Sequence, residues 1–438
     1  MTRTGAPGEI DLAYGRDRLR LQLPAHARPA VIRQAQLPAL PDPEGAVLRA
    51  LAAPIDAAPL TELARGRTSA CIVVCDTTRP VPNRLFLRPM IEQIAAAGVP
   101  LHTITVLVAT GLHRPNEGDE LAELIGDPWV LSHVRVENHD ARDDAGHRML
   151  GRTATRGTPV GLDARFVEAD LRIVTGLVEP HFMAGWSGGR KVIAPGVAHH
   201  ETIRTLHSAR FMADPRATQC VLEGNPLHEE QVAIVGMLGE VYALNTVIDE
   251  ERRLAHVTFG SVVASHLASV EVVAASVRVS VPRRFRTVVT SAAGHPLDTT
   301  FYQTIKAMVT PLDVLEPGGT LIIASACAQG LGSAEFRAAQ ERLVTLGPDG
   351  FDALILDKQF ADVDEWQTQL QLKSLRAGRV ELFTTGLGAA DRKLTGVHLV
   401  DDLAAAVDAS LRKHDDPHLA VLPEGPYVIP YVDRDVPG

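Results

Sequence analysis

Short runs of β-branched and other apolar residues alternate with helix-like segments along this chain. The runs "ACIVVCD" (70–76), "LHTITVLVATG" (101–111) and "LRIVTGLV" (171–178) each have the length and composition of a buried strand, and helix-forming or polar sequence follows each one. Strands that alternate with helices form parallel sheets with helical crossovers, so this pattern predicts an α/β fold. The carboxyl ends of such strands share one edge of the sheet, which is where ligands bind.

A second alternation begins after "SVPRRF" (280–285), where proline and arginines interrupt the helical pattern. The segments 287–294 and 318–332 have the pattern of a strand followed by a turn, and "FDALILD" (351–357) and "RVELFTTG" (379–386) continue the alternation. The chain therefore contains a second α/β unit.

Two domains are also expected from the length, because a chain of 438 residues exceeds the size at which a single core keeps growing. We predict an N-terminal domain over residues 1–282 and a C-terminal domain over 287–412, each with a parallel or mixed sheet flanked by helices. The Pro-rich tail, residues 416–438, is expected to be extended and to pack back on the N-terminal domain. The active site is expected in the cleft between the two domains.

The net charge of −10 argues against nucleic acid and anionic membranes as partners. The N-terminus has no apolar core of a secretory signal, and charged residues interrupt the most apolar stretch, which begins at Phe259. Four cysteines in so long a chain do not form a disulfide framework. We therefore expect a cytoplasmic protein that neither spans nor binds a membrane.

Chemically reactive side chains follow each of the three N-terminal strands. "DTTRP" carries Asp76 and Arg79, "ATGLHRP" carries His113, and "EPHFMAGWSGGRK" carries His181. An imidazole at a strand end acts as acid or base near neutral pH, and two of them flank one ligand from opposite sides. The guanidinium group of Arg79 is suited to bind the carboxylate of a ligand through two hydrogen bonds. A structural ion pair between Arg79 and an acidic residue would have the same sequence pattern.

A glycine-rich turn precedes Lys191. Gly188 and Gly189 offer backbone N–H groups to an anion, but the spacing is not that of a P-loop. The segment "HHETIRTLH" that follows predicts a helix with His200 and His207 one heptad apart, and imidazole is a ligand for nickel, zinc, copper or iron. His199, beside His200, is expected to face solvent.

The C-terminal unit contributes a weaker pattern. "TTFYQTIK" predicts the start of a helix on which Tyr302 or Gln303 shares a face with Lys306. Trp366, one of three tryptophans, lies in a polar context. Alone, these residues are compatible with an ordinary polar helix surface.

Together these motifs resemble the nickel-pincer lactate racemases, over most of the chain from "DTTRP" to Trp366. The most specific part is "EPHFMAGWSGGRKVIAPGVAHHETIRTLH" (179–207), and "ATGLHRP" and "YQTIK" follow the order of the family. The resemblance implies a racemase or epimerase of 2-hydroxy acids. It implies nickel and a pyridinium-3,5-bisthiocarboxylic acid mononucleotide as cofactors, and the enzymes that synthesise the nucleotide as partners.

The resemblance also implies a role for each matching residue. Lys191 looks like the lysine that tethers the nucleotide, and His207 looks like the nickel ligand. His113 and His181 look like the paired acid/base histidines. The other matches are Asp76, Gly188 and Gly189 near the cofactor, and Arg79, Tyr302, Gln303, Lys306 and Trp366 at the substrate.

The mechanism that the resemblance implies is a reversible hydride transfer. One histidine takes the hydroxyl proton while the C2 hydride moves to the cofactor, and the hydride then returns to the other face of the 2-keto acid. A C2 proton beside a carboxylate is too weakly acidic for simple deprotonation at neutral pH, which favours a hydride acceptor.

One departure concerns the substrate. Ala326 and Ala328 stand where acidic residues are expected, so the pocket is altered and lactate itself is in doubt as the substrate. Two other function classes remain open from the sequence. One is a non-catalytic binder or carrier of the nickel cofactor, and the other is a metal-dependent hydro-lyase that uses the same histidines.

Overall fold

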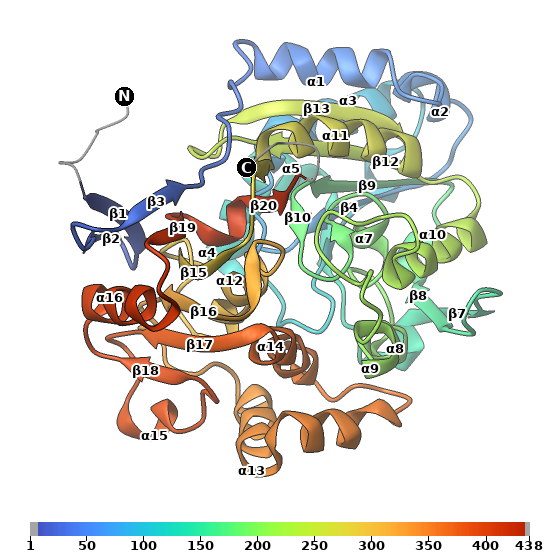
Figure 1. The fold of residues 1–438 in the computed structure, drawn as a ribbon. Coiled ribbons are helices and arrows are strands. Elements are labelled where there is room, and N and C mark those ends of the chain that lie inside the picture. Colours follow the sequence, from blue (N-terminus) through green and yellow to red (C-terminus); the bar gives the residue numbers. More distant parts are fainter. Residues whose placement is uncertain (1–7, 434–438) are drawn as a thin grey trace. The chain divides into compact units, whose positions relative to one another are not determined.

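The computed structural model describes residues 8–433, and the chain divides into two compact units (Figure 1). The first unit comprises residues 36–207 and 214–275. The second unit comprises the segment up to residue 35, the short segment 208–213 and the chain from residue 276 onward. Both are α/β units.

The first unit is built on a six-stranded mixed sheet. Its strands are parallel except for the antiparallel pair at one edge, β12 and β13. In spatial order they are β13 (Leu254–Ser261), β12 (Tyr242–Ile248), β9 (Leu171–Leu177), β4 (Ala70–Cys75), β5 (Ile104–Ala109) and β6 (Arg135–Asn138).

Alternate side chains of the central strand β4 enter two separate cores. Ile72 and Val74 belong to one hydrophobic cluster, and Cys71 and Val73 belong to the other. This period of two is what a strand covered on both faces requires. Helices on the first face are α1 (Pro43–Ala52), α2 (Leu60–Leu63), α3 (Leu87–Ala96), α4 (Gly118–Ile125) and α5 (Pro128–His133).

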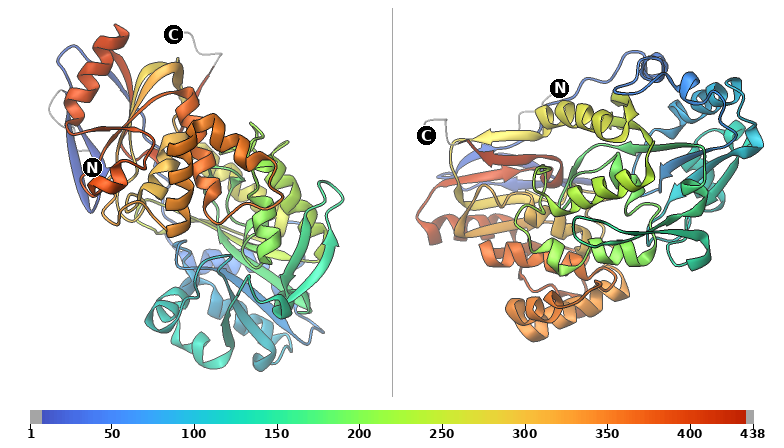
Figure 2. Two further views of the ribbon diagram at one scale, coloured as in Figure 1. Left: turned by 90° about the horizontal axis from the view of Figure 1, so that it is seen from below. Right: turned by 90° about the vertical axis from the view of Figure 1, so that its right-hand side faces the viewer.

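The opposite face carries the elements that hold most of the predicted site. They are the hairpin β7 (His147–Arg152) and β8 (Pro159–Asp163), and the helices α6 (Ala164–Val167), α7 (Arg190–Ile193), α8 (His200–Leu206), α10 (Pro226–Leu238) and α11 (Val262–Val277) (Figure 2). Short elements between them are η1 (Asn83–Leu85), η2 (Leu101–Thr103), η3 (Asp144–Gly146), β10 (Pro180–His181) and β11 (Gly185–Trp186).

The second unit has a six-stranded sheet that is parallel throughout. Its order is β18 (His398–Val400), β17 (Gly378–Phe383), β16 (Leu315–Ala324), β15 (Phe285–Ser291), β19 (His418–Leu422) and β3 (Arg28–Val31). A hairpin and one helix pack on one face: β1 (Glu9–Tyr14), β2 (Asp17–Gln22) and α16 (Leu403–His414).

Two further helices pack on the same central strands, α12 (Phe301–Val309) and α14 (Glu365–Ala377). The bent helix α13 (Ala334–Leu356) lies on α14 together with α9 (Ala209–Met212). The remaining elements are α15 (Ala389–Arg392), η4 (Gly425–Tyr427) and the parallel pair β14 (Arg278–Val281) and β20 (Ile429–Val432).

The predicted fold class is confirmed, since both units are sheets flanked by helices. One predicted element is wrong, because "FDALILD" lies within α13 rather than in a strand. Its buried residues, Phe351 and Ile355, are four positions apart and therefore share one face of the helix. A short apolar run of this kind is compatible with a strand or a helix, so its pattern alone does not decide between them.

The grouping of the chain ends differs from the expected one. Strand β3 pairs with β19 from Arg28 opposite His418, so both belong to the sheet of the second unit. The tail is extended, and its strand β20 pairs with β14, which lies within the expected N-terminal range 1–282 but is grouped with the second unit. Among residues 8–433, no helix has the length and hydrophobicity that crossing a bilayer requires.

Candidate active site

The carboxyl edge of the first unit's sheet holds the reactive residues that follow its strands. Asp76 comes directly after β4, and His113 follows β5 by a tight turn in which its N–H donates to the Thr110 carbonyl at 2.9 Å. His181 follows β9. Because β9, β4 and β5 are neighbours and parallel, these three turns meet at one edge of the sheet.

His113 and Asp76 form a hydrogen-bonded pair. Nδ1 of His113 lies 2.6 Å from Oδ2 of Asp76, and the other carboxylate oxygen accepts from the Thr78 hydroxyl at 2.6 Å and from its N–H at 3.2 Å. Burial alone raises the pKa of Asp76, but the hydrogen bonds from His113 and Thr78 outweigh it and lower that pKa. Asp76 is therefore a carboxylate that holds the proton of His113 on Nδ1 and leaves the lone pair on Nε2.

Arg79 is paired with Glu179, which lies just after β9. Burial alone would lower the pKa of Arg79, but the negative charge of Glu179 outweighs this effect, so the net pKa is raised. Glu179 was not predictable from the sequence as the partner, since the two residues are 100 positions apart. The arginine is thus held at the same edge of the sheet by an acid of the neighbouring strand.

His181 lies in the small hairpin formed by β10 and β11 and is 5% exposed. Its Nδ1 accepts long hydrogen bonds from the N–H groups of Ala184 at 3.2 Å and Met183 at 3.4 Å. A backbone N–H only donates, so Nδ1 carries no proton and Nε2 does. His181 and His113 therefore have opposite tautomers.

The glycine turn before α7 is shaped by close packing. Gly188 and Gly189 have φ of +79° and +48°, and a Cβ on Gly189 would lie 2.9 Å from Cβ of His266. The N–H of Gly189 donates to Oδ1 of Asn245 at 3.0 Å. That N–H is committed to the protein, so an anion at this turn would depend on other donors.

Arg190, beside Lys191, connects α7 with the His181 hairpin. It is 0% exposed, and its Nη2 donates to the carbonyls of Ala184 at 2.9 Å and Trp186 at 3.2 Å. Burial lowers the pKa of Arg190 to about 9. This role was not predictable from the sequence, because a buried and an exposed arginine look alike in a glycine-rich turn.

Lys191 and His207 lie within electrostatic range of each other. His207 ends α8, and its Nδ1 donates to the Ile203 carbonyl at 2.8 Å. Burial lowers the pKa of His207 to about 4, and the charge of Lys191 adds to the decrease. Burial also raises the pKa of the Cys75 thiol to about 11, while Lys191 opposes that shift. Lys191 thus influences both the end of β4 and the end of α8.

In the second unit, the structure brings Tyr302 and Trp366 together. Nε1 of Trp366 donates to the Tyr302 hydroxyl at 3.3 Å, and the Gln367 amide donates to the Tyr302 carbonyl at 2.7 Å. Burial raises the pKa of Tyr302, so its hydroxyl stays protonated. Gln303 and Lys306 lie on the same helix, α12, which begins at Phe301 as the sequence predicted to within a residue or two.

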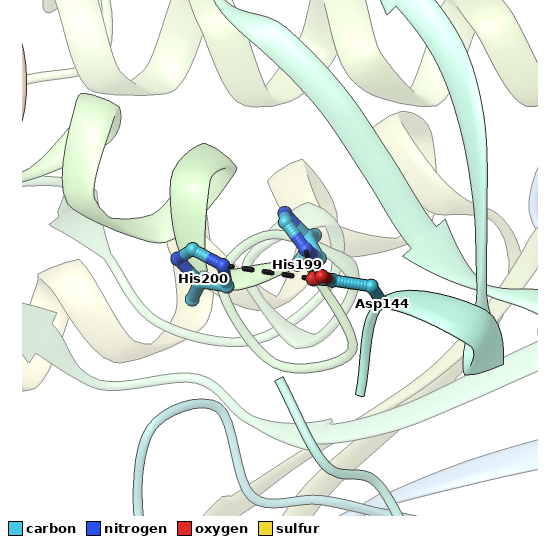
Figure 3. A group of neighbouring side chains, drawn as sticks. All are labelled: Asp144, His199 and His200. Carbon is cyan, nitrogen blue, oxygen red and sulfur yellow. Dashed lines mark hydrogen bonds and ion pairs between the residues drawn. The ribbon is translucent and has the colours of Figure 1, made fainter. Parts of the chain in front are cut away.

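His199 does not face solvent, contrary to expectation. It is 6% exposed, caps the start of α8 and lies 2.8 Å from Asp144, with His200 next to it (Figure 3). Asp144 belongs to η3, 55 residues earlier in the chain, so the sequence offered no signal for this group beyond the adjacent histidines.

The comparisons with known proteins match both units. The family model described as lactate racemase N-terminal domain matches residues 14–220, and the lactate racemase C-terminal domain matches residues 283–430. Curated relatives include the lactate racemase of Thermoanaerobacterium thermosaccharolyticum, 30% identical over 427 residues, which are 96% of this chain and 98% of the relative. The lactate racemase of Lactiplantibacillus plantarum is 29% identical over 379 residues, 84% of this chain and 85% of the relative.

Solved structures agree with these matches. The lactate racemase apoprotein of T. thermosaccharolyticum is similar with a TM-score of 0.89 and 29% identity, covering 96% of this chain and 99% of that one. A Thermotoga maritima protein is similar with a TM-score of 0.62 and 16% identity, covering 92% of this chain and 100% of that one, which shows a shared fold alone.

Proposed function

Because the chain belongs to the lactate racemase family and is thus an isomerase, we propose that it interconverts the enantiomers of a 2-hydroxy acid by reversible hydride transfer from C2. The proposal is supported by two observations. The His113–Asp76 pair and His181 follow neighbouring parallel strands of one sheet, and Lys191 lies within electrostatic range of both Cys75, at the end of β4, and His207. The enzymes that make the cofactor would be its partners, and the cytoplasm its compartment.

The cofactor that we assign is nickel in a pyridinium-3,5-bisthiocarboxylic acid mononucleotide tethered to Lys191. The environment of His207 fits a metal ligand: its pKa of about 4 keeps the imidazole neutral, and the Nδ1–H bond to Ile203 places the lone pair on Nε2. Histidines that bind a metal through one ring nitrogen are usually oriented by a hydrogen bond that the other ring nitrogen donates. When bound, the group would supply a two-electron acceptor for a hydride, which protein side chains lack.

His113 is the base in this proposal. Its Nε2 has the lone pair, so it accepts the hydroxyl proton of the substrate as C2 loses a hydride with its electron pair and the C–O bond becomes a carbonyl. The imidazolium that forms is stabilised by the carboxylate of Asp76, 2.6 Å from Nδ1. The protein thereby provides a proton acceptor whose charged form is paired with the buried carboxylate of Asp76.

His181 provides the opposite group. Its Nε2 carries a proton in the resting protein and would donate a hydrogen bond to the oxygen of the keto acid, whereas transfer of a proton to that oxygen requires the imidazolium form, in which Nδ1 is protonated as well. Accepting a proton at Nε2 requires Nδ1 to take one too, which disrupts the long contacts from Met183 and Ala184. A full acid/base role for His181 therefore includes a rearrangement of the hairpin that holds it.

Substrate recognition is proposed for the remaining predicted residues, Arg79, Tyr302, Gln303, Lys306 and Trp366. The support in the second unit is the Trp366–Tyr302 hydrogen bond, which fixes an indole beside a phenol at the start of α12. Ala326 and Ala328 replace the acids that the family resemblance leads one to expect. We therefore propose that the substrate is a 2-hydroxy acid whose side chain differs from that of lactate.

The test is a panel of enantiopure 2-hydroxy acids, lactate included, offered to cofactor-loaded protein and separated by chiral chromatography. In D2O, the product of a returned hydride keeps protium at C2, whereas a deprotonation mechanism introduces deuterium. A carrier of the cofactor converts no substrate, and a hydro-lyase yields an alkene acid instead of the enantiomer. Either of those results would refute the proposed function.

A further inference from the structure

A group of three metal-binding side chains lies away from the residues assigned to catalysis. Asp144 of η3, His199 and His200 each offer one ligand atom, and these atoms all lie within 4.8 Å of one another (Figure 3). Nε2 of His199 is 2.8 Å and Nε2 of His200 is 3.8 Å from Oδ1 of Asp144. Both imidazoles thus converge on one carboxylate oxygen.

The geometry points to a binding site for a divalent transition-metal ion, formed by Asp144, His199 and His200 and separate from His207. Ligands held at zinc-like bond lengths of about 2.1 Å stand about 3.0 to 3.4 Å apart at octahedral or tetrahedral angles. The two observed nitrogen–oxygen separations lie on either side of that range. Asp144 is exposed and His200 half-buried, so small rotations of both side chains bring the ligands into place.

The ligand set selects the class of ion. Two imidazoles and one carboxylate suit zinc, nickel, cobalt or iron rather than calcium or magnesium, which prefer oxygen ligands. Three protein ligands at a partly exposed position leave coordination sites for water.

His199 must change tautomer for the ion to bind. Its Nδ1 now accepts a long contact of 3.4 Å from the N–H of Glu201, so Nε2 carries the proton that it donates to Asp144. The ion replaces this proton between Nε2 and Oδ1, and Nδ1 becomes protonated. The capping contact from the Glu201 N–H to Nδ1 is lost in this way.

A third histidine, His147, adds a lone pair beside the group. The ring of His147 meets that of His199 edge-on, with centroids 5.0 Å apart. Nδ1 of His147 donates to the Asp143 carbonyl at 2.6 Å, so its lone pair is on Nε2. That nitrogen is buried and has no hydrogen-bond partner among the described residues, which is unusual for a polar atom and leaves an unused lone pair next to the group.

An ion at this site would join η3 to the start of α8. His207 follows the other end of this seven-residue helix. The proposed site and His207 are therefore separated by the length of α8, about 10 Å at 1.5 Å per residue. The site needs no nucleotide, because all three ligands come from the protein. It is therefore tested on protein without cofactor.

The experiment uses the tag-free, cofactor-free full chain with His207→Ala, so that binding at His207 is removed. Zinc is titrated by equilibrium dialysis, and cobalt is added separately to record its visible absorption. We expect one zinc ion per chain at micromolar concentrations, and cobalt absorption that zinc abolishes. Absence of binding at these concentrations would overturn the inference.

Two variants locate the ion. Asp144→Asn and His200→Gln should each raise the zinc dissociation constant about tenfold or more, since even changes to residues that only hydrogen-bond to a metal ligand weaken binding that much. Matched controls are Asp119→Asn and His102→Gln, both exposed residues outside the cluster, which should leave the constant unchanged. Equal binding by parent and both cluster variants would refute the site. The result is independent of racemase activity, because no substrate is present.

Discussion

The pairing of His113 with Asp76 predicts the effect of one conservative substitution, Asp76→Asn. Thr78 donates to Oδ1 of Asp76 through both its hydroxyl and its N–H, so an asparagine would keep its carbonyl oxygen there. Its NH2 group would then take the place of Oδ2 and face Nδ1 of His113. The amide would donate where the carboxylate accepts, which moves the histidine's proton to Nε2 and removes the proposed base.

The expected decrease in kcat has two causes, the lost hydrogen bond and the reversed tautomer. A hydrogen bond to a charged group is worth about 1.5–3 kcal/mol, which corresponds to about 10- to 150-fold in rate at about 1.36 kcal/mol per tenfold. The side chain of His113 is 62% exposed, so water replaces part of this stabilisation and the lower end applies. Reversal of the His113 tautomer lowers kcat further, since the corresponding aspartate-to-asparagine substitution in a serine protease triad lowers kcat by about 10⁴-fold. We expect kcat to fall by about 10²- to 10⁴-fold with little change in KM.

The assay is racemisation by cofactor-loaded protein in both directions, followed by chiral chromatography on the 2-hydroxy acid that the panel identifies. Asp119→Asn is the control for a neutralised exposed carboxylate. The double variant Asp76→Asn/Thr78→Val releases the pinned carbonyl, so the amide is able to turn and recover part of the lost rate. A single variant with kcat within about twofold of the parent would refute a catalytic role for the pair, and a double variant no faster than the single would refute the tautomer argument.

The remaining predictions concern the cofactor, the second acid/base group and the pH dependence of stability. Lys191→Ala should abolish the covalent adduct seen by intact-protein mass spectrometry together with activity, and an active variant would disprove the tether. His207→Ala should lose the cofactor-bound nickel measured by elemental analysis and by absorbance beyond the aromatic band. His181→Gln keeps an N–H donor but cannot exchange a proton, so we expect a loss of about 10²-fold in both directions; a nearly full rate would reduce His181 to a hydrogen-bond donor. Burial raises the pKa of Asp163, but Arg165 and His139 lower it overall. Its contribution to the free energy of unfolding is therefore present above the unfolded pKa of about 3.9 and is lost as pH falls below it. The difference in urea stability between parent and Asp163→Asn should shrink over that range.

Local patterns were sufficient to predict the strands and the turns that carry the site. The runs that became β4, β5 and β9 are short, apolar and followed by turns, and a parallel arrangement forces their carboxyl ends to one edge. The helix from His200 to Leu206 was predicted because its polar and apolar residues have helical spacing. Each of these conclusions depends on residues that are close in sequence.

Long-range pairing was not predictable in the same way. Strand β3 joins β19 across nearly the whole chain, and nothing in "RPAV" (28–31) distinguishes that partner from a nearer strand. The ion pair of Arg79 with Glu179 and the contact of His199 with Asp144 have the same cause. In these two contacts, the sequence identified Arg79 and His199 as residues of interest, but only the fold revealed their partners.

The difference between His113 and His181 shows why a motif fixes a residue type but not its chemical state. Both histidines follow a strand, and both were expected to act as an acid and a base. The side chain of Asp76 accepts the Nδ1 proton of His113, whereas the main chain of Met183 and Ala184 donates to Nδ1 of His181. The same ring therefore presents a lone pair on Nε2 in one place and an N–H on Nε2 in the other, and only the folded surroundings of each histidine decide which.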